Sequence, residues 1–303
     1  MAPCVLGRVA TVYFAVGSRS LQKASRSAAS SKLYGGGADV TLRAMLVTDE
    51  LTARKLRRTP AHPFDVVAVD AGASHAAEFE ATRPVADRSR VSTSERWRNR
   101  QDPANLALRR LRAAKIRAVA TALQHFDVAL LMDADTYVCS SLVEAACAVA
   151  GDYSLGEQHV VAFVPVDRGR EHASTVLARS ERWRVPRHAV EANTGVVAWR
   201  NSSASQLLVD AWLRAYDDLA DASGFLMDQP AFRAALHATR APYAALPPHF
   251  NCRGHDRTRS KSAVPLRCAG YDAGAADGAV AARLRGGAGC AVLHSHDIQE
   301  PGR

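Results

Sequence analysis

The chain has 303 residues, 48% of them hydrophobic and 23% charged, and carries a formal net charge of +9. This composition is ordinary for a folded protein with a sizeable core, and it excludes the low hydrophobicity of a disordered chain. No apolar run is long enough to cross a bilayer, and residues 1–16 lack the features of a secretory signal, so we expect a soluble chain without a membrane segment. We find no repeat and no linker, and therefore predict a single domain over residues 1–303, with an irregular C-terminal region at 248–303.

Apolar, β-rich runs alternate with helical segments along the chain. This alternation predicts an α/β fold in which a mixed, mostly parallel sheet is flanked by helices. The expected strands are 9–16, 40–47, 64–69, 128–135, 160–164 and 195–199, and the expected helices are 19–32, 106–123, 142–150, 204–220 and 229–239.

Most of the positive charge is concentrated in one segment. Between Arg83 and Arg117 there are eleven basic and three acidic residues, a balance of +8 out of the total of +9. Such a segment fits either a solvated loop and helix face or a surface for an anionic polymer. Trp97 is the single aromatic residue among these charges, so we favour the solvated face and expect no nucleic-acid partner.

Two carboxylates follow the most apolar run of the sequence. Asp133 and Asp135 end the expected strand that begins at Val128, and alternation along a strand would direct both to the same side. Ligands of open α/β sheets bind at this carboxyl end of the strands. The two carboxylates are suitable ligands for a divalent cation, whose other positions diphosphate oxygens can fill.

Other interpretations of the same pair carry less weight. An Asx-turn that closes a strand would also place acidic residues here. A phosphatase-type DxDxT signature needs a threonine four residues after the first aspartate, but Tyr137 occupies that position. A nucleotidyltransferase would need a glycine-rich, lysine-bearing signature after the first strand, which the segment 17–20 lacks.

The six cysteines do not form a CxxC pair, so a structural zinc site is not expected. Cys139 and Cys147 lie among apolar residues, and we expect them to be buried thiols. Any two of Cys252, Cys268 and Cys290 could form a disulfide, which together with the possible glycosylation acceptor Asn201-Ser202-Ser203 would indicate a secretory compartment.

Four short motifs follow one another in a recognisable order. They are Leu131-Met132-Asp133-Ala134-Asp135-Thr136, Asn193-Thr194-Gly195, Met227-Asp228-Gln229-Pro230 with Leu246-Pro247-Pro248-His249-Phe250-Asn251, and Val292-Leu293-His294. This order and spacing resemble the GT-A nucleotide-sugar-dependent glycosyltransferases, especially the retaining family 8 and related nucleotide-diphospho-sugar transferases, from about Val9 to His296.

The resemblance implies a role for each matching residue. Asp133, Asp135 and His294 would hold Mn²⁺ or Mg²⁺, and the metal would bridge the diphosphate of the donor. Asp228 and Gln229 would be the catalytic pair beside the donor sugar. A basic residue of the preceding helix would also reach the donor, and Lys115 and Arg117 both remain candidates. The full expected donor-binding set is Asp133, Ala134, Asn193, Thr194, Gly195, Asp228, Lys115 and Arg117.

The C-terminal end departs from the pattern of the family. No Lys-Pro-Trp follows His294, so the anchoring of the diphosphate is open, with Arg303 or the Arg253 region as possible substitutes. His296 is an alternative third ligand.

The expected activity is transfer of a sugar, with retention, from a nucleotide-sugar, most simply a UDP-sugar, to a glycan, protein or small-molecule acceptor. The alternative is a catalytically degenerate relative that binds an anionic polymer. The family suggests the Golgi lumen, whereas the lack of an anchor would fit the cytoplasm.

Overall fold

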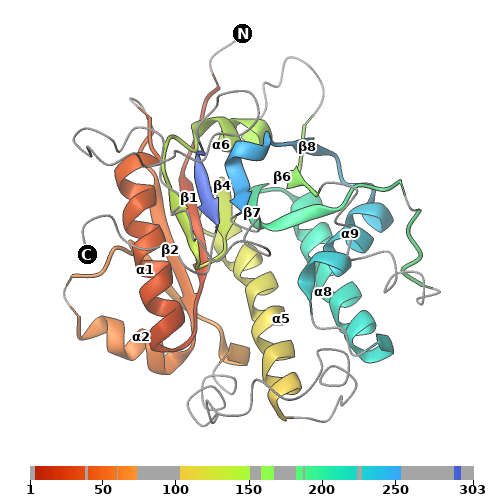
Figure 1. Cartoon of the computed structure of the whole chain (residues 1–303), viewed down its shortest axis with the longest axis horizontal. Coiled ribbons are helices and arrows are strands. Elements are labelled where there is room, and N and C mark those ends of the chain that lie inside the picture. The colour runs from red at the N-terminus through yellow and green to blue at the C-terminus, as the bar shows by residue number, and fades with distance from the viewer. Residues whose placement is uncertain are drawn as a thin grey trace, which may run out of the picture.

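The computed structural model describes residues 4–37, 40–59, 61–73, 103–150, 158–166, 182–186, 188–223, 227–253 and 290–294. A seven-stranded sheet with the order β3-β2-β1-β4-β7-β6-β8 forms its centre (Figure 1). Its strands are β1 (Val9–Phe14), β2 (Arg43–Thr48), β3 (Val66–Val69), β4 (Val128–Met132), β6 (Val161–Pro165), β7 (Ala192–Arg200) and β8 (Tyr243–Ala245). The helices are α1 (Gly17–Tyr34), α2 (Glu50–Arg57), α5 (Pro103–Leu123), α6 (Val143–Ala150), α8 (Ser203–Ser223) and α9 (Asp228–Thr239), with a 3₁₀ turn η4 (Pro248–Asn251).

The sheet is parallel on one side and mixed on the other. Strands β3, β2, β1 and β4 pair in parallel, so their carboxyl ends lie at one edge. Strand β7 pairs antiparallel with both β4 and β6, and β8 pairs parallel with β6. The amino-terminal part of β7 therefore meets the carboxyl end of β4. This junction brings the 193–195 motif beside the aspartates that follow Met132.

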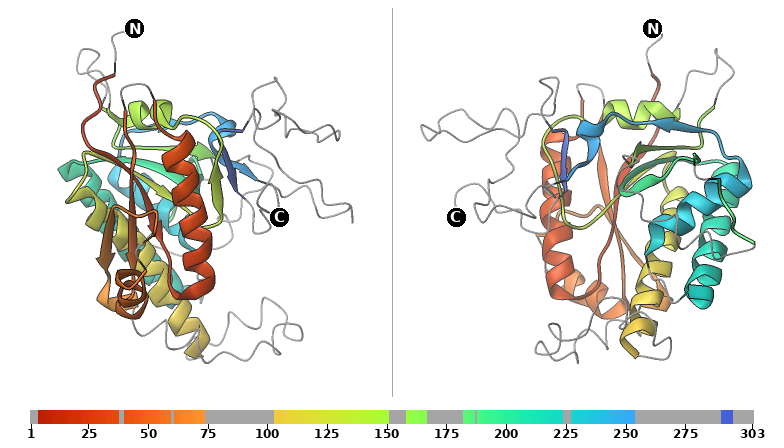
Figure 2. Two further views of the ribbon diagram at one scale, coloured as in Figure 1. Left: turned by 90° about the vertical axis from the view of Figure 1, so that its left-hand side faces the viewer. Right: turned by 45° about the vertical axis from the view of Figure 1, so that its right-hand side comes forward.

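Both faces of the central strands are buried, which explains their continuous apolar sequence. On β4, Ala129 and Leu131 belong to a core cluster shared with α5, α8 and α9. Val128, Leu130 and Met132 point to the opposite cluster, which includes residues of α1 and α6. Figure 2 shows these helices on the two sides of the sheet. The α5 face is important for the site because Lys115 of this helix contacts Asp133, the residue that follows β4.

A second, small sheet lies beside the carboxyl edge. It has the order β5-β10-β9, with β5 at Thr136–Val138, β10 at Val292–His294 and β9 at Cys252–Arg253. Strand β10 pairs antiparallel with β5 and parallel with β9. This sheet (β10 in blue, Figure 2) joins the end of the described chain to the turn after β4.

The expected α/β class is confirmed, and every predicted helix and strand has a counterpart. The boundaries of several strands differ from the expected ones by two or three residues. The difference that affects the site is at β4, which ends at Met132, so the two aspartates lie in a turn before β5. Among the described residues, no helix is long and apolar enough to cross a membrane.

The prediction of two buried thiols was also wrong. Cys147, on α6, forms a disulfide with Cys4, and Cys139 is disulfide-bonded as well. Helix α6 carries Cys147 to the segment that precedes β1, a long-range contact that local apolar sequence does not reveal. Cys252 and Cys290 form the disulfide that was expected within the C-terminal third.

Candidate functional site

The two aspartates are brought together by a turn between the large and the small sheet. Thr136, the first residue of β5, closes this turn, because its backbone N–H and its hydroxyl both donate to the Asp133 carbonyl, at 3.2 and 2.8 Å. The Thr136 hydroxyl also lies 2.8 Å from the Ser27 hydroxyl on α1. The expected proximity of Asp133 and Asp135 is therefore present, but a turn produces it rather than alternation along a strand.

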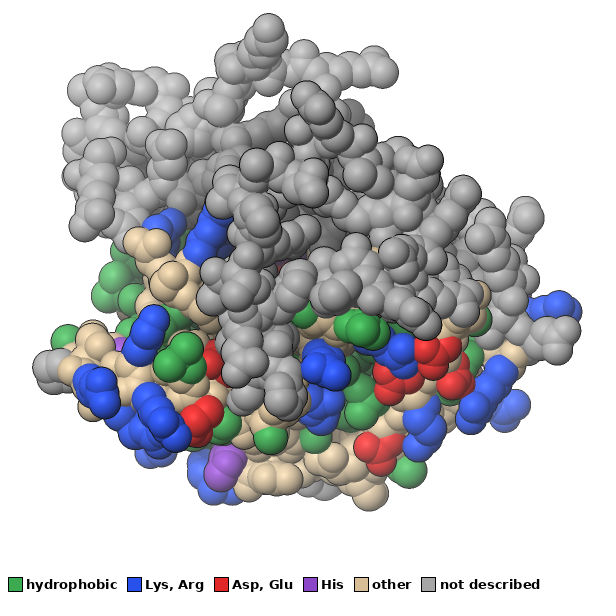
Figure 3. Space-filling view, turned by 90° about the horizontal axis from the view of Figure 1, so that it is seen from below, with side chains coloured by type: hydrophobic (Ala, Val, Ile, Leu, Met, Phe, Trp, Pro, Cys, Tyr) green, Lys and Arg blue, Asp and Glu red, His purple; other side chains and the backbone are tan. Residues whose placement is uncertain are grey.

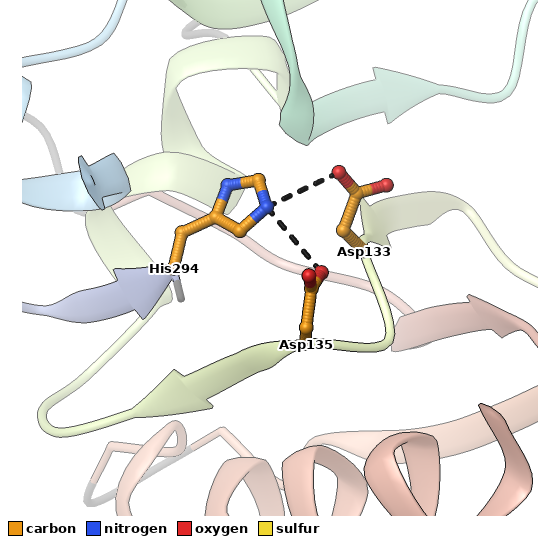
Figure 4. A group of neighbouring side chains, drawn as sticks. All are labelled: Asp133, Asp135 and His294. Atoms are coloured by element: carbon orange, nitrogen blue, oxygen red, sulfur yellow. Dashed lines mark ion pairs between the residues drawn. The ribbon is translucent and has the colours of Figure 1, made fainter. Parts of the chain in front are cut away.

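Strand β10 supplies an imidazole to this turn. His294 is paired with Thr136 in the β10–β5 register. Its Nε2 atom lies 3.4 Å from Asp133 Oδ2 and 3.4 Å from Asp135 Oδ1. Figure 4 shows the three side chains directed toward one another, and their possible ligand atoms all lie within 4.8 Å. The structure thus gathers the three residues that sequence motifs proposed as metal ligands.

The chemistry of this cluster fits a divalent cation. Two carboxylates with one imidazole suit Mn²⁺, and the carboxylates alone suit Mg²⁺. His294 Nδ1 lies 2.9 Å from Asn251 Oδ1, and this amide oxygen can accept a hydrogen bond only if Nδ1 carries the proton. In the neutral imidazole with this tautomer, the lone pair of Nε2 faces the two carboxylates, as metal-binding histidines require. Asn251 ends the 246–251 motif, but the sequence alone assigned it no role.

Gly195 makes room for the imidazole. A Cβ atom on this residue would lie 2.4 Å from His294 Cε1, 2.5 Å from His294 Nδ1 and 3.2 Å from Asp133 Oδ2. No real Cβ atom tolerates the first two distances. The glycine of the 193–195 motif therefore has a reason in this structure that is independent of any bound donor.

A buried lysine connects Asp133 to the second acidic motif. Lys115 Nζ lies 2.7 Å from Asp133 Oδ1 and 2.9 Å from Asp228 Oδ2, and donates a longer bond of 3.4 Å to the Thr194 carbonyl. Arg112, one turn earlier on α5, lies 3.6 Å from Asp228 Oδ1. Two cations of one helix thus compensate the buried carboxylate of Asp228 and the half-buried carboxylate of Asp133.

These charges control the ionisation of the pair. Burial by itself would raise the pKa of Asp228, but the positive charges of Lys115 and Arg112 outweigh burial and lower its pKa to about 2. Burial would lower the pKa of Lys115, but the charges of Asp133 and Asp228 hold that pKa above its usual value. Asp228 is therefore a carboxylate and Lys115 an ammonium across the neutral pH range.

The structure separates the two basic candidates on α5. Arg117 forms an ion pair with Asp70 after β3, with bonds of 2.8 Å from Nε and 2.7 Å from Nη2. Two residues along a helix correspond to about 200°, so Arg117 and Lys115 point to different sides of α5. Lys115 joins the cluster of Asp133 and Asp228, whereas Arg117 lies against Asp70.

The remaining donor-binding candidates lie around the same junction. Asn193 Oδ1 accepts a bond of 3.1 Å from the Gly195 N–H, which shapes the motif from within. Thr194 Oγ1 lies 3.5 Å from Asp228 Oδ2. Ala134 lies in the turn between the two aspartates and is half-buried. All of them surround the carboxyl end of β4.

Gln229 follows Asp228 at the start of α9 and contacts a residue that sequence reasoning missed. Its Nε2 donates a bond of 2.6 Å to Glu191 Oε1. Arg233, also on α9, lies 3.5 Å from Glu191 Oε2. A glutamate four residues before the expected strand 195–199 carries no local signal for this contact, because the contact depends on how α9 packs on β7.

Part of the basic segment lies outside the described residues, namely 83–102, and so do His296 and Arg303. Within its described part, Arg109 is paired with Asp217 and Asp221 on α8. Arg109 also lines, with Arg117 and Asp217, a cavity of about 490 Å³ between α5 and α8. Figure 3 shows basic and acidic side chains intermixed on the described part of this face.

The fold is similar to that of solved sugar-transferring enzymes. No protein-family model matches the chain, and no curated protein matches it in sequence. Among solved structures, the galactosyltransferase LgtC in complex with donor and acceptor sugar analogs is similar, with a TM-score of 0.53 and 12% identity over 95% of this chain and 87% of that one. The apo form of mouse xyloside xylosyltransferase 1 is similar with a TM-score of 0.51 and 13% identity, over 95% of this chain and 97% of that one. The chain thus has the GT-A fold that its motifs predicted.

Proposed function

We propose that this protein is a metal-dependent glycosyltransferase that moves a sugar from a nucleotide-sugar, most simply a UDP-sugar, to a glycan, protein or small-molecule acceptor. The observation that carries the proposal is the convergence of Asp133, Asp135 and His294 at the carboxyl edge of a GT-A sheet. The similarity of the whole fold to a galactosyltransferase and a xylosyltransferase supports the same class of reaction.

Asp133, Asp135 and His294 would hold Mn²⁺ or Mg²⁺. When bound, the metal would neutralise the negative charge that develops on the departing nucleoside diphosphate. The side chains of these residues are 23%, 13% and 9% exposed, so the cluster is sheltered but accessible. Lys115 and Arg112 keep the surrounding charge balanced, since Asp133 and Asp228 would otherwise repel an anionic donor.

The chain's own side chains would orient the sugar. Asp228 is held as a carboxylate and can accept hydrogen bonds from sugar hydroxyls, and Gln229 beside it would face the reacting carbon. The described site offers no separate side chain placed as a general base. A reaction with retention does not need one, because the leaving phosphate oxygen can take the proton of the acceptor.

The compartment that fits the chain is an oxidising one. The disulfides Cys4–Cys147 and Cys252–Cys290 form and persist in the secretory pathway. Asn201 of the possible glycosylation acceptor is exposed at the end of β7. We therefore place the protein in the lumen of the secretory pathway, with the Golgi as the specific proposal.

The direct test is a screen of nucleotide-sugars with Mn²⁺ and mixed acceptors, scored by released nucleoside diphosphate. We expect turnover with one donor class, its loss in Asp135→Ala, and a product with the anomeric configuration of the donor by NMR. An inverted product would overturn retention alone. No release from any donor, together with steeply salt-dependent binding of heparin, would favour the anionic-polymer alternative.

A further inference from the structure

A buried carboxylate that belongs to none of the sequence motifs contacts the proposed catalytic glutamine. Glu191 lies directly before β7 and is 2% exposed. Its Oε1 accepts the bond of 2.6 Å from Gln229 Nε2, and its Oε2 lies 3.5 Å from Nη1 of Arg233. Arg233 follows Gln229 by one turn of α9 and is equally buried, so both side chains reach Glu191 from the same face of the helix.

This arrangement determines which end of the Gln229 side-chain amide faces Glu191. The guanidinium of Arg233 stays charged in proteins, and the carboxylate of Glu191 compensates it. An ionised carboxylate accepts hydrogen bonds but cannot donate them. The NH₂ group of Gln229 must therefore face Glu191, which leaves Oε1 of the amide on the other side.

We propose that Glu191 is a positioning residue, which holds the amide of Gln229 with its carbonyl oxygen toward the donor sugar. The inference rests on the proposed function, because it takes Gln229 to lie beside the reacting carbon. Positive charge develops on that carbon as the bond to the diphosphate breaks. An amide oxygen directed there stabilises this charge, whereas an NH₂ group in its place would oppose it.

The first test is a double-mutant cycle on turnover. Glu191→Gln keeps the size of the side chain, but the new amide can both donate and accept hydrogen bonds. The Gln229 amide is then no longer held in one orientation. We expect kcat to fall about tenfold with a much smaller change in the KM for the donor, the size expected for one hydrogen bond to a charged group. In a Gln229→Ala background, the same change should not lower kcat further, because there is no amide left to orient.

Arg233→Lys is the graded comparison. It keeps a cation beside Glu191 and leaves the Gln229 contact in place, so it should lower kcat less than Glu191→Gln does, even where the two variants lower the melting temperature equally. An equal loss of kcat from Glu191→Gln with and without Gln229 would show that Glu191 acts only through stability, and would overturn the proposal.

A second measurement does not depend on turnover. The chain has seven glutamines, so glutamine-selective ¹⁵N labelling gives few side-chain amide signals, and Gln229→Ala identifies the relevant one. A short bond to a carboxylate predicts one strongly downfield, slowly exchanging proton in the wild type, lost in Glu191→Gln. An ordinary shift with fast exchange would overturn the proposal. The shifted proton without turnover on any donor would instead overturn the proposed function, while the orientation of Gln229 would stand.

Discussion

At the scale of single residues, the 193–195 motif shows that a residue proposed for ligand binding can have a structural reason that the sequence does not reveal. Gly195 was expected to belong to the donor-binding set. In the structure, the space that a side chain would fill is occupied by the imidazole of His294. The sequence reveals the residue type, but not the neighbour, because the two residues come from different strands.

Gly195→Ala should therefore weaken metal binding more than it weakens the fold. The new Cβ atom must displace the ring of His294 or move β7, and either shift moves His294 out of position as a proposed metal ligand. Disturbance of residues that orient a ligand typically lowers metal affinity by about 10- to 100-fold. Titration of Mn²⁺ followed by EPR measures this loss. Gly37→Ala is the control, because its Cβ would meet only Val143 Cγ2 at 3.2 Å; equal Mn²⁺ affinity in both variants would contradict the role of Gly195.

Asp228 predicts a specific pH dependence of stability. Its folded pKa of about 2 lies below the ordinary value of 3.8, so it contributes stability above pH 3.8 that is lost as the pH falls toward 2. The shift corresponds to about 2 kcal/mol. Urea unfolding of the wild type and of Asp228→Asn should give a difference in the free energy of unfolding that shrinks by this amount on acidification.

The exposed Asp210 on α8 offers the control for that measurement. Asp210→Asn should give a stability profile parallel to that of the wild type through the same pH range. A difference for Asp228→Asn that stays constant with pH would mean that Lys115 and Arg112 do not control the ionisation of this carboxylate.

At the scale of elements, the small sheet explains why the site could be predicted only in part. The order of the motifs predicted His294 as a metal ligand, but nothing local indicated that β10 would pair with β5 beside Asp135. Strands of three residues carry too little pattern to be assigned from sequence. The same holds for Glu191, whose contact with Gln229 arises only when α9 packs on β7.

The disulfide Cys252–Cys290 should support the proposed metal site. It links Cys252 of β9 to Cys290, which lies two residues before β10. Strand β9 also pairs with β10, which carries His294. Replacing both cysteines by alanine should lower stability by about 2–5 kcal/mol and also lower the affinity for Mn²⁺. Thermal unfolding and Mn²⁺ titration measure the two effects separately.

The disulfide Cys4–Cys147 is the matched control, since it joins the N-terminal segment to α6 rather than to the small sheet. Its removal should also reduce stability but leave Mn²⁺ affinity unchanged. The same loss of Mn²⁺ affinity in both double variants would show that the loss follows from general destabilisation, and would contradict a specific role of the Cys252–Cys290 link in presenting His294.

At the scale of the whole molecule, the periodicity of the sequence predicted the α/β class, the main helices and the parallel half of the sheet. Long apolar runs such as Val128–Met132 identify strands that are buried on both faces. Sequence could not fix the antiparallel placement of β7, because strand direction depends on long-range packing. That placement is decisive for the site, since it brings the 193–195 motif to the carboxyl end of β4.

Calorimetric titration of UDP into the full chain, with and without Mn²⁺, tests the central claim most directly. If Asp133, Asp135 and His294 hold a cation that anchors a nucleoside diphosphate, UDP should bind in the presence of Mn²⁺, and EDTA or Asp135→Ala should abolish the binding. Binding of UDP that is equally tight without the metal, or no binding under either condition, would contradict the account.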